Sequence, residues 1–175
     1  MMKTNSNRVV VSCLAFFLIL FFLTSIGLCA DEKKEGDVSC KYCGMLKSKF
    51  GHSWMIIEYD DGTKSELCSI HGAAIDLALN IDKFPEVISV GDYNTKVPID
   101  AERAFWVIGG DKMGVMTARA KWAFQTKDAA DAFIKDHGGK LVTFDDAMKS
   151  AYEDMYDDTK MIRKKRQMKR MKKNM

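Results

Sequence analysis

A β-hairpin predicted over residues 54–68 is the feature that most constrains the fold of this chain. A run rich in β-branched and aromatic residues is followed by Asp61-Gly62, a dipeptide typical of tight turns, and then by a second run that ends at Cys68. A hairpin returns the chain to the side from which it entered. Cys68 should therefore lie close to the segment that precedes the first strand.

That preceding segment, Cys40-Lys41-Tyr42-Cys43-Gly44-Met45, holds two thiols and one thioether within six residues. Thiolate and thioether sulfur both bind soft ions, above all Cu(I), whereas zinc would use the cysteines but has little use for the methionine. A disulfide, with Met45 packed as a core residue, is the alternative reading. The Cys-x-x-Cys spacing favours a metal site over that alternative.

Two further interpretations of the cysteines remain open. Cys40, Cys43, Cys68 and His71 together have the spacing of a zinc knuckle, and the hairpin brings both pairs to one end, where a closed four-ligand site would be structural. A thiol-disulfide protein is the other possibility. In that class the Cys-x-x-Cys pair opens a helix after a strand, whereas here it precedes a hairpin.

The first 30 residues are predicted to form a signal peptide or a membrane anchor. Lys3 and Arg8 precede an uncharged apolar run over residues 9–28, and this run is long enough to span a bilayer. Residues 26–29 have the outline of a lipobox, in which Cys29 would be lipidated. Each alternative places the rest of the chain on the periplasmic side of the cytoplasmic membrane or in the cell envelope. Residues 31–39 form a charged linker.

Charge is distributed unevenly along the chain. All 24 acidic residues lie within residues 31–159, together with 16 basic ones, whereas residues 160–175 carry nine basic residues and no acidic one. The small net charge of +3 therefore gives no reason to expect a nucleic-acid partner. Residues 149–175 are predicted to be a helical extension with a basic, Lys/Met-rich tail. This tail is either solvated, attracted to anionic lipid, or part of a methionine relay for copper.

The remaining pattern, over residues 40–148, predicts one α+β domain built from two similar half-chains. Residues 40–80 and 87–148 each carry strands followed by a helix, with Ser69 and Thr126 as the expected N-caps. Residues 94–100 are expected to form a loop. No glycine-rich phosphate loop, Gly-x-Ser-x-Gly elbow or His-Glu-x-x-His motif is found, so we expect a binding protein rather than an enzyme.

An ordered set of short motifs between residue 40 and about residue 148 resembles the NosL family, the nitrous oxide reductase accessory proteins. The motifs are Cys40-Lys41-Tyr42-Cys43-Gly44-Met45, Leu67-Cys68-Ser69, Asp92-Tyr93, Ile99-Asp100-Ala101, residues 104–109, Met113-Gly114-Val115-Met116, residues 124–133 and His137-Gly138-Gly139. Each motif alone is weak. The combination, in this order, is specific.

The resemblance implies two small lobes of mainly antiparallel strands plus helix, akin to part of the organomercurial lyases. It also implies an exported, usually lipid-anchored metallochaperone that delivers Cu(I) to a cuproenzyme such as apo nitrous oxide reductase, alongside other copper-assembly proteins. By position, Cys43 and Met45 would be the metal-binding Cys-x-Met pair and Met116 a further sulfur ligand. Cys40 is adjacent and would assist.

Overall fold

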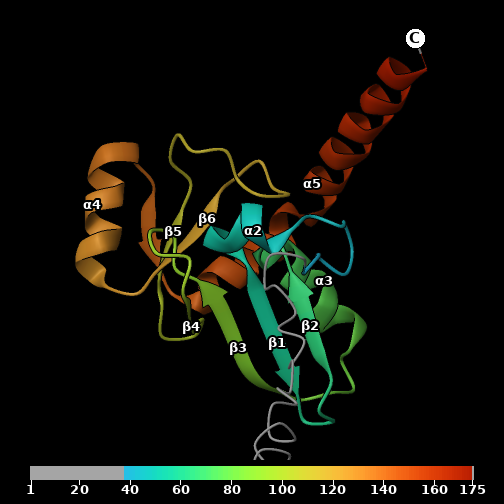
Figure 1. Ribbon diagram of the computed structural model, residues 1–175. Helices are drawn as coiled ribbons and strands as arrows, with labels where there is room; N and C mark the ends of the chain where they lie inside the picture. The colour runs from blue at the N-terminus through green and yellow to red at the C-terminus, as the bar shows by residue number, and fades with distance from the viewer. Residues whose placement is uncertain (1–37, 175) are drawn as a thin grey trace, which may run out of the picture. The chain divides into compact units, whose positions relative to one another are not determined.

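The computed structural model describes residues 38–174, which fold around two antiparallel sheets. The first sheet has the order β2-β1-β3-β4, with β1 (Met55–Tyr59), β2 (Lys64–Leu67), β3 (Pro85–Gly91) and β4 (Pro98–Asp100). The second has the order β6-β5-β7, with β5 (Phe105–Ile108), β6 (Lys121–Phe124) and β7 (Lys140–Val142). The helical segments are α2 (Lys47–Phe50), the 3-10 turn η2 (Gly51–Ser53), α3 (Ile70–Leu79), α4 (Lys127–His137) and α5 (Phe144–Lys173) (Figure 1).

The two sheets repeat one plan, and this confirms the predicted α+β fold with two similar lobes. In each lobe a hairpin is followed by a helix and then by a strand that pairs with the first strand of the hairpin: β3 lies beside β1, and β7 lies beside β5. The predicted division of the half-chains was wrong in one respect. β3 was expected to open the second half, but it completes the first sheet, and β4 extends that sheet within residues expected to form a loop.

The central strand β1 is buried on both faces, and it separates two hydrophobic cores. Met55, Ile57 and Tyr59 pack on one side with α3 and the first turns of α5. Trp54 and Ile56 point to the other side, where the cysteine segment and the second lobe meet them. This follows from the two-residue period of a strand. The cysteine segment is thus attached directly to the core.

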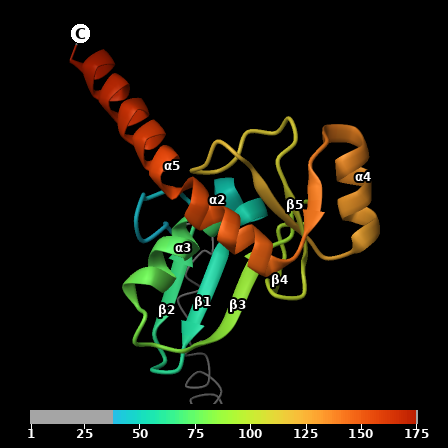
Figure 2. The ribbon, with the colours of Figure 1, turned by 180° about the vertical axis from the view of Figure 1, so that it is seen from behind.

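In the rear view of Figure 2, helix α5 passes in front of the first sheet and then continues beyond it. Thr143 caps it by accepting from the Asp146 N–H, and Phe144, Ala147 and Met148 are buried in the first core. The helix runs without a break across residue 148, where the predicted domain boundary lay. The predicted extension is therefore continuous with the packed part of the protein.

The N-caps differ from the prediction in one case. Thr126 caps α4 as expected, because its hydroxyl accepts from the Ala129 N–H. Ser69 occupies the N-cap position of α3, but it makes no side-chain cap there. Ala78 of α3 is exposed, whereas Asp76 of the same helix is completely buried.

Asp76 holds the cysteine segment against the first sheet. Its carboxylate accepts hydrogen bonds from Tyr42 Oη (2.5 Å), Lys41 Nζ (2.9 Å) and, in β1, Tyr59 Oη (2.7 Å). Burial raises the pKa of this carboxyl group, but the hydrogen bonds outweigh burial and leave the pKa below its usual value. An ionised Asp76 is therefore the stable form in the folded protein.

Within residues 38–174 no helix combines the length and hydrophobicity that a bilayer span requires. The predicted signal or anchor over residues 1–30, Cys29 and most of the linker lie outside the described residues.

Gly91 provides a test of how β3 packs against η2 within the first lobe. At this position a Cβ atom would lie 1.8 Å from the carbonyl oxygen of Gly51, and the Gly91 N–H already donates to the Trp54 carbonyl oxygen at 2.7 Å. Because backbone atoms cannot move aside cheaply, Gly91→Ala should lower the free energy of unfolding by about 3 kcal/mol. In the matched change Gly72→Ala, inside α3, the nearest atom would be 3.4 Å away, so the effect should stay within about 1 kcal/mol. Urea denaturation measures both, and equal values would contradict this packing.

Replacement of Asp76 by Asn tests the carboxylate clamp. Because the folded pKa of Asp76 lies below the unfolded value of about 3.9, its ionised form stabilises the fold above about pH 4, and this contribution is lost as the pH falls through the folded pKa. Asp76→Asn should cost about 2–4 kcal/mol at neutral pH and remove part of the acid dependence of stability. Asp82→Asn, at an exposed position, is the control. Denaturation from pH 3 to pH 7 that gives the same slope for Asp76→Asn and the wild type would exclude the clamp.

Candidate metal centre

The loop that carries the first two cysteines is closed by its own backbone. The Cys40 N–H donates to the Met45 carbonyl oxygen at 2.8 Å, and the Gly44 N–H donates to the Cys40 carbonyl oxygen at 3.0 Å. Gly44 has a φ of +73°, which only glycine adopts without cost, and this allows the chain to reverse just before Met45. Residues 40–45 therefore fold into a compact loop.

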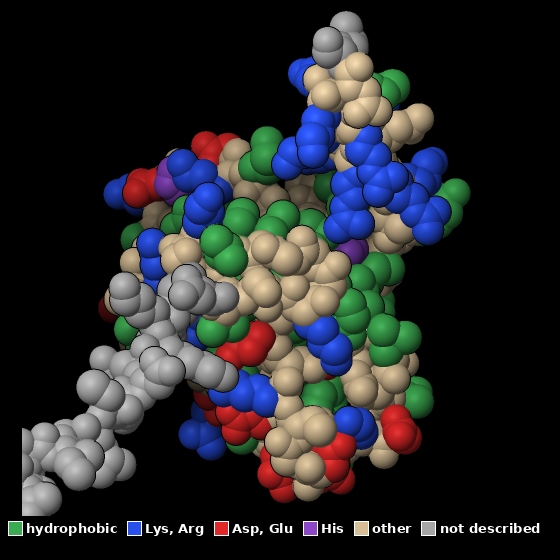
Figure 3. Space-filling view, turned by 45° about the vertical axis from the view of Figure 1, so that its right-hand side comes forward, with side chains coloured by type: hydrophobic (Ala, Val, Ile, Leu, Met, Phe, Trp, Pro, Cys, Tyr) green, Lys and Arg blue, Asp and Glu red, His purple; other side chains and the backbone are tan. Residues whose placement is uncertain are grey.

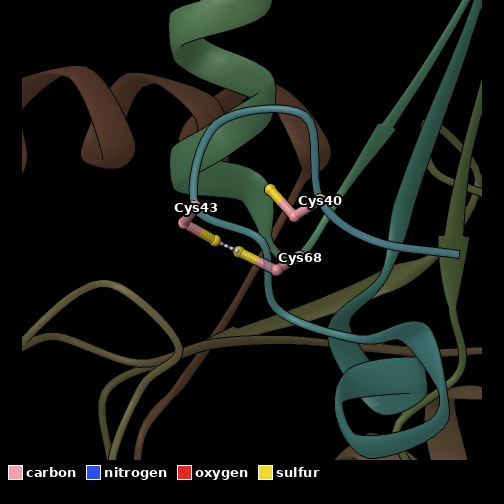
Figure 4. Close-up of side chains that lie close together, drawn as sticks. All are labelled: Cys40, Cys43 and Cys68. Carbon is pink, nitrogen blue, oxygen red and sulfur yellow. Dashed lines mark hydrogen bonds between the residues drawn. The ribbon is translucent and has the colours of Figure 1, made fainter.

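Three cysteines converge beneath this loop (Figure 4). The sulfur atoms of Cys40, Cys43 and Cys68 all lie within 4.8 Å of one another, and the Cys43 and Cys68 sulfurs are 3.4 Å apart. All three are free thiols. Cys40 and Cys68 are buried, whereas Cys43 is partly exposed. Three sulfurs bonded to one ion at about 2.3 Å would lie about 4 Å apart in a trigonal plane, so the cluster needs little rearrangement to hold a thiophilic ion.

The pKa values of the three thiols are shifted in different directions. A hydrogen bond from Cys68 lowers the pKa of Cys40, and the same contact raises the pKa of Cys68. Burial raises the pKa of Cys43. One thiolate supported by two neutral thiols is the arrangement that these shifts favour.

His71 does not join the cysteines, so the four-ligand zinc arrangement is not assembled. The group of close ligand atoms among residues 38–174 contains the three cysteines alone. His71 is buried with its Nδ1 3.5 Å from Asp158 Oδ2 of α5, and burial lowers its pKa. The helix that begins after Cys68 directs this side chain toward α5 instead.

An open cleft adjoins the cluster, and Cys43 belongs to both. The cleft has a volume of about 460 Å³. Its lining side chains come from four segments and are mostly apolar, sulfur-containing or cationic: Cys43, Met45, Phe50, His52, Met113, Gly114, Val115, Met116, Met161, Ile162, Lys165 and Arg166. Four thioethers therefore face the same space as the partly exposed thiol. No carboxylate is among these residues.

The loop between β5 and β6, residues 109–120, carries Met113 and Met116 and is called the methionine loop. Its backbone is tightly constrained. At Gly114 a Cβ atom would come within 2.9 Å of Thr117 and Ala120, so the loop packs on itself at this point. Met116 has a φ of +61°, which is uncommon for a residue with a side chain. Strained backbone of this kind often marks a functional position. Met113 at the rim is 81% exposed.

The structure brings the residues predicted from the sequence to one place. Cys43, Met45 and Met116 line the cleft, and Cys40 lies in the adjoining cluster. Sequence reasoning named Cys68 as a ligand only in the zinc interpretation, and it considered Met161 only among the methionines of residues 149–175, for which a copper relay was one alternative. The hairpin was the available signal for Cys68, whereas nothing local to Met161 indicated its position. Their roles as copper ligands stay predictions.

The donor set determines what this site can bind. Thiolates and thioethers are soft ligands that suit Cu(I), and the lack of carboxylates in the cleft disfavours hard cations such as Mg²⁺ and Ca²⁺. The residues present therefore fit a soft monovalent ion. The partly exposed side, where Cys43 lies, leaves room for ligand exchange.

Comparison with known proteins agrees with this geometry. The NosL family model matches residues 33–152. The crystal structure of the copper chaperone NosL from Shewanella denitrificans is 26% identical in sequence, with a TM-score of 0.53, and the match covers 63% of this chain and 89% of that one. No curated protein matches the chain. Since the family model spans more than half of the sequence, this chain belongs to the NosL family.

Proposed function

We propose that this protein is an exported Cu(I) carrier that receives the ion at the sulfur site and passes it to a cuproenzyme. The observation that carries the proposal is the junction at Cys43, which belongs to both the three-cysteine cluster and the methionine-lined cleft. The copper chaperone from Shewanella denitrificans, which shares the fold, supports copper as the cargo. Membership of the NosL family supports a binding protein rather than an enzyme.

The ligand atoms of the cluster and the cleft favour Cu(I) over a harder divalent ion. Thiolate and thioether sulfur both suit Cu(I), and the residues that line the cleft offer no carboxylate. Zinc would require four ligands in a closed tetrahedron. His71, the expected fourth ligand, lies against Asp158 instead.

Release requires a partly open site, because an incoming ligand must contact the ion before the old one leaves. Cys43 is partly exposed, and the highly exposed Met113 lies at the rim of the same cleft. A partner with its own sulfur or imidazole ligands can therefore reach the ion from this side. The two buried cysteines retain it from behind.

The client that fits best is a cuproenzyme assembled outside the cytoplasm, such as apo nitrous oxide reductase. One support is membership of the NosL family, whose motifs the sequence resembles and which the resemblance describes as nitrous oxide reductase accessory proteins. The other is the apolar run over residues 9–28, which is typical of an exported or membrane-anchored chain. On this proposal, Cys29 or the apolar run attaches the carrier to the membrane. Cu(I) is then the cargo of the site, and other copper-assembly proteins load it.

Anaerobic competition with a chromophoric Cu(I) chelator tests the carrier. Cys43→Ser should weaken Cu(I) binding by about 100-fold, and Met45→Leu by about tenfold, since loss of even a supporting group in a metal site costs about 10–100-fold. Cys68→Ser should also weaken binding, because its sulfur completes the cluster. The control is Met168→Leu, an exposed thioether of α5 that does not line the cleft, and its affinity should match that of the wild type.

X-ray absorption of the loaded protein provides the second readout. Sulfur neighbours around copper are expected, and only nitrogen and oxygen neighbours would contradict the proposal. Unchanged affinity in both Cys43→Ser and Met45→Leu would contradict it as well. Stoichiometric zinc in protein purified without added metal, with unfolding on chelation, would favour a structural zinc module instead.

A further inference from the structure

The buried face of α5 continues directly into the cleft. Its inward positions recur at helical spacing, as expected for one face of a helix: Phe144, Ala147, Met148, Ala151, Met155, Asp158, Met161 and Ile162. The first five of these pack on the core between α3 and the second sheet. Met161 and Ile162 lie further along the same face and line the cleft. Lys165, three residues further along, is exposed and also lines the cleft.

Three hydrogen-bond donors hold α5, at Asp154 and Asp158, against the methionine loop and the first residue of β6. Asp154 receives Arg119 Nη2 and Lys121 Nζ, each at 2.8 Å, and Asp158 Oδ1 accepts from the Ala118 N–H at 2.9 Å. Asp158 is 2% exposed and Lys121 is 5% exposed, so the contacts of these two residues are largely shielded from solvent, whereas Arg119 pairs with Asp154 at the surface. Ala118 is two residues beyond Met116. The loop that presents Met116 and the helix that presents Met161 are thus held together.

Beyond Asp158 the helix has few contacts other than those of the cleft. From Arg163 to Asn174 every described residue is exposed, and lysine and arginine side chains gather on this projecting part (Figure 3). Between Asp158 and Arg163, the partly buried residues are Thr159, Met161 and Ile162. The last point at which α5 contacts the rest of the protein is therefore the sulfur-lined cleft.

Met161 also lies outside the part of the chain that matches the family model. The match ends at residue 152, nine residues before Met161. Cys43, Met45, Met113 and Met116 all lie within the match. A fifth sulfur side chain at the cleft is thus contributed by the extension of α5.

We propose that Met161 is an additional thioether ligand for the ion in the cleft, and that α5 beyond Asp158 forms a fixed cover that slows the loss of this ion. The inference rests on the proposed binding of Cu(I) at Cys43 and Met45. Cu(I) bound by few sulfurs exchanges readily, and one more thioether from above the cleft adds a bond that must break before release. The cover thereby favours transfer to a docked partner over loss to solvent.

Met161→Leu tests the ligand directly, because leucine keeps the apolar volume and removes the sulfur. The matched control is Met155→Leu, six residues earlier on the buried side of α5, which packs against the core and does not line the cleft. In Met161→Leu the loaded protein should release Cu(I) to a chelator about tenfold faster and show fewer sulfur neighbours by X-ray absorption. Met155→Leu should match the wild type in both.

A second measurement needs no substitution in the site. With methionine methyl groups labelled by carbon-13, addition of Cu(I) to the wild-type protein should shift the Met161 signal and leave that of Met155 in place. The expected shift, with faster release in Met161→Leu, supports the inference. If Met161→Leu releases copper at the wild-type rate and the Met161 signal does not move, the inference fails. In that case Cys43→Ser separates the two proposals: weakened binding leaves the carrier standing, and unchanged binding removes it too.

Discussion

The site depends on one buried carboxylate. Asp76, completely excluded from solvent in α3, accepts hydrogen bonds from Lys41 and Tyr42 of the cysteine loop and from Tyr59 of the central strand. A buried charge is stable only when it is paired and hydrogen-bonded, so these three donors are held as firmly as the carboxylate itself. The loop is thereby fixed above Cys68, which ends the hairpin. Without this anchor, the loop would keep its backbone hydrogen bonds, including that of the Lys41 N–H to the Glu66 carbonyl oxygen of β2, but would lose its buried carboxylate.

The sulfur site has a buried part and a part that opens to solvent. Two buried thiols form a cluster with Cys43, and Cys43 alone of the three also lines the cleft where thioethers gather. Thioethers are neutral, weaker donors than thiolates, and they add affinity for a soft ion without adding charge. On the proposed function, buried thiols on one side and open, neutral thioethers on the other would hold a soft ion and still present it to a partner. These are the properties that a carrier requires, in contrast to the closed tetrahedron of a structural zinc site.

Helix α5 couples the second lobe to this site. Its acidic residues Asp154 and Asp158 bind the methionine loop through Arg119, Lys121 and the Ala118 N–H. The helix then passes over the cleft and carries a cationic surface beyond it. The family model matches only to residue 152, so the later part of α5 lies outside the match. The two lobes repeat one topology, but the site is asymmetric: cysteines come from the first lobe and methionines mainly from elsewhere.

The sequence alone determined the local parts of this protein. The hairpin brought Cys68 to the cysteine loop, and the order of short motifs gave the α+β fold and the family, because turn residues and strand periodicity act over a few positions. Tertiary structure decided the rest. His71 points to Asp158 rather than to the cysteines, β3 completes the first sheet, and Met161 reaches the cleft from more than a hundred residues beyond Cys43. Helix direction relative to a distant loop depends on how the cores pack and on buried ion pairs such as Lys121 with Asp154. No pattern within a short window of sequence carries that information.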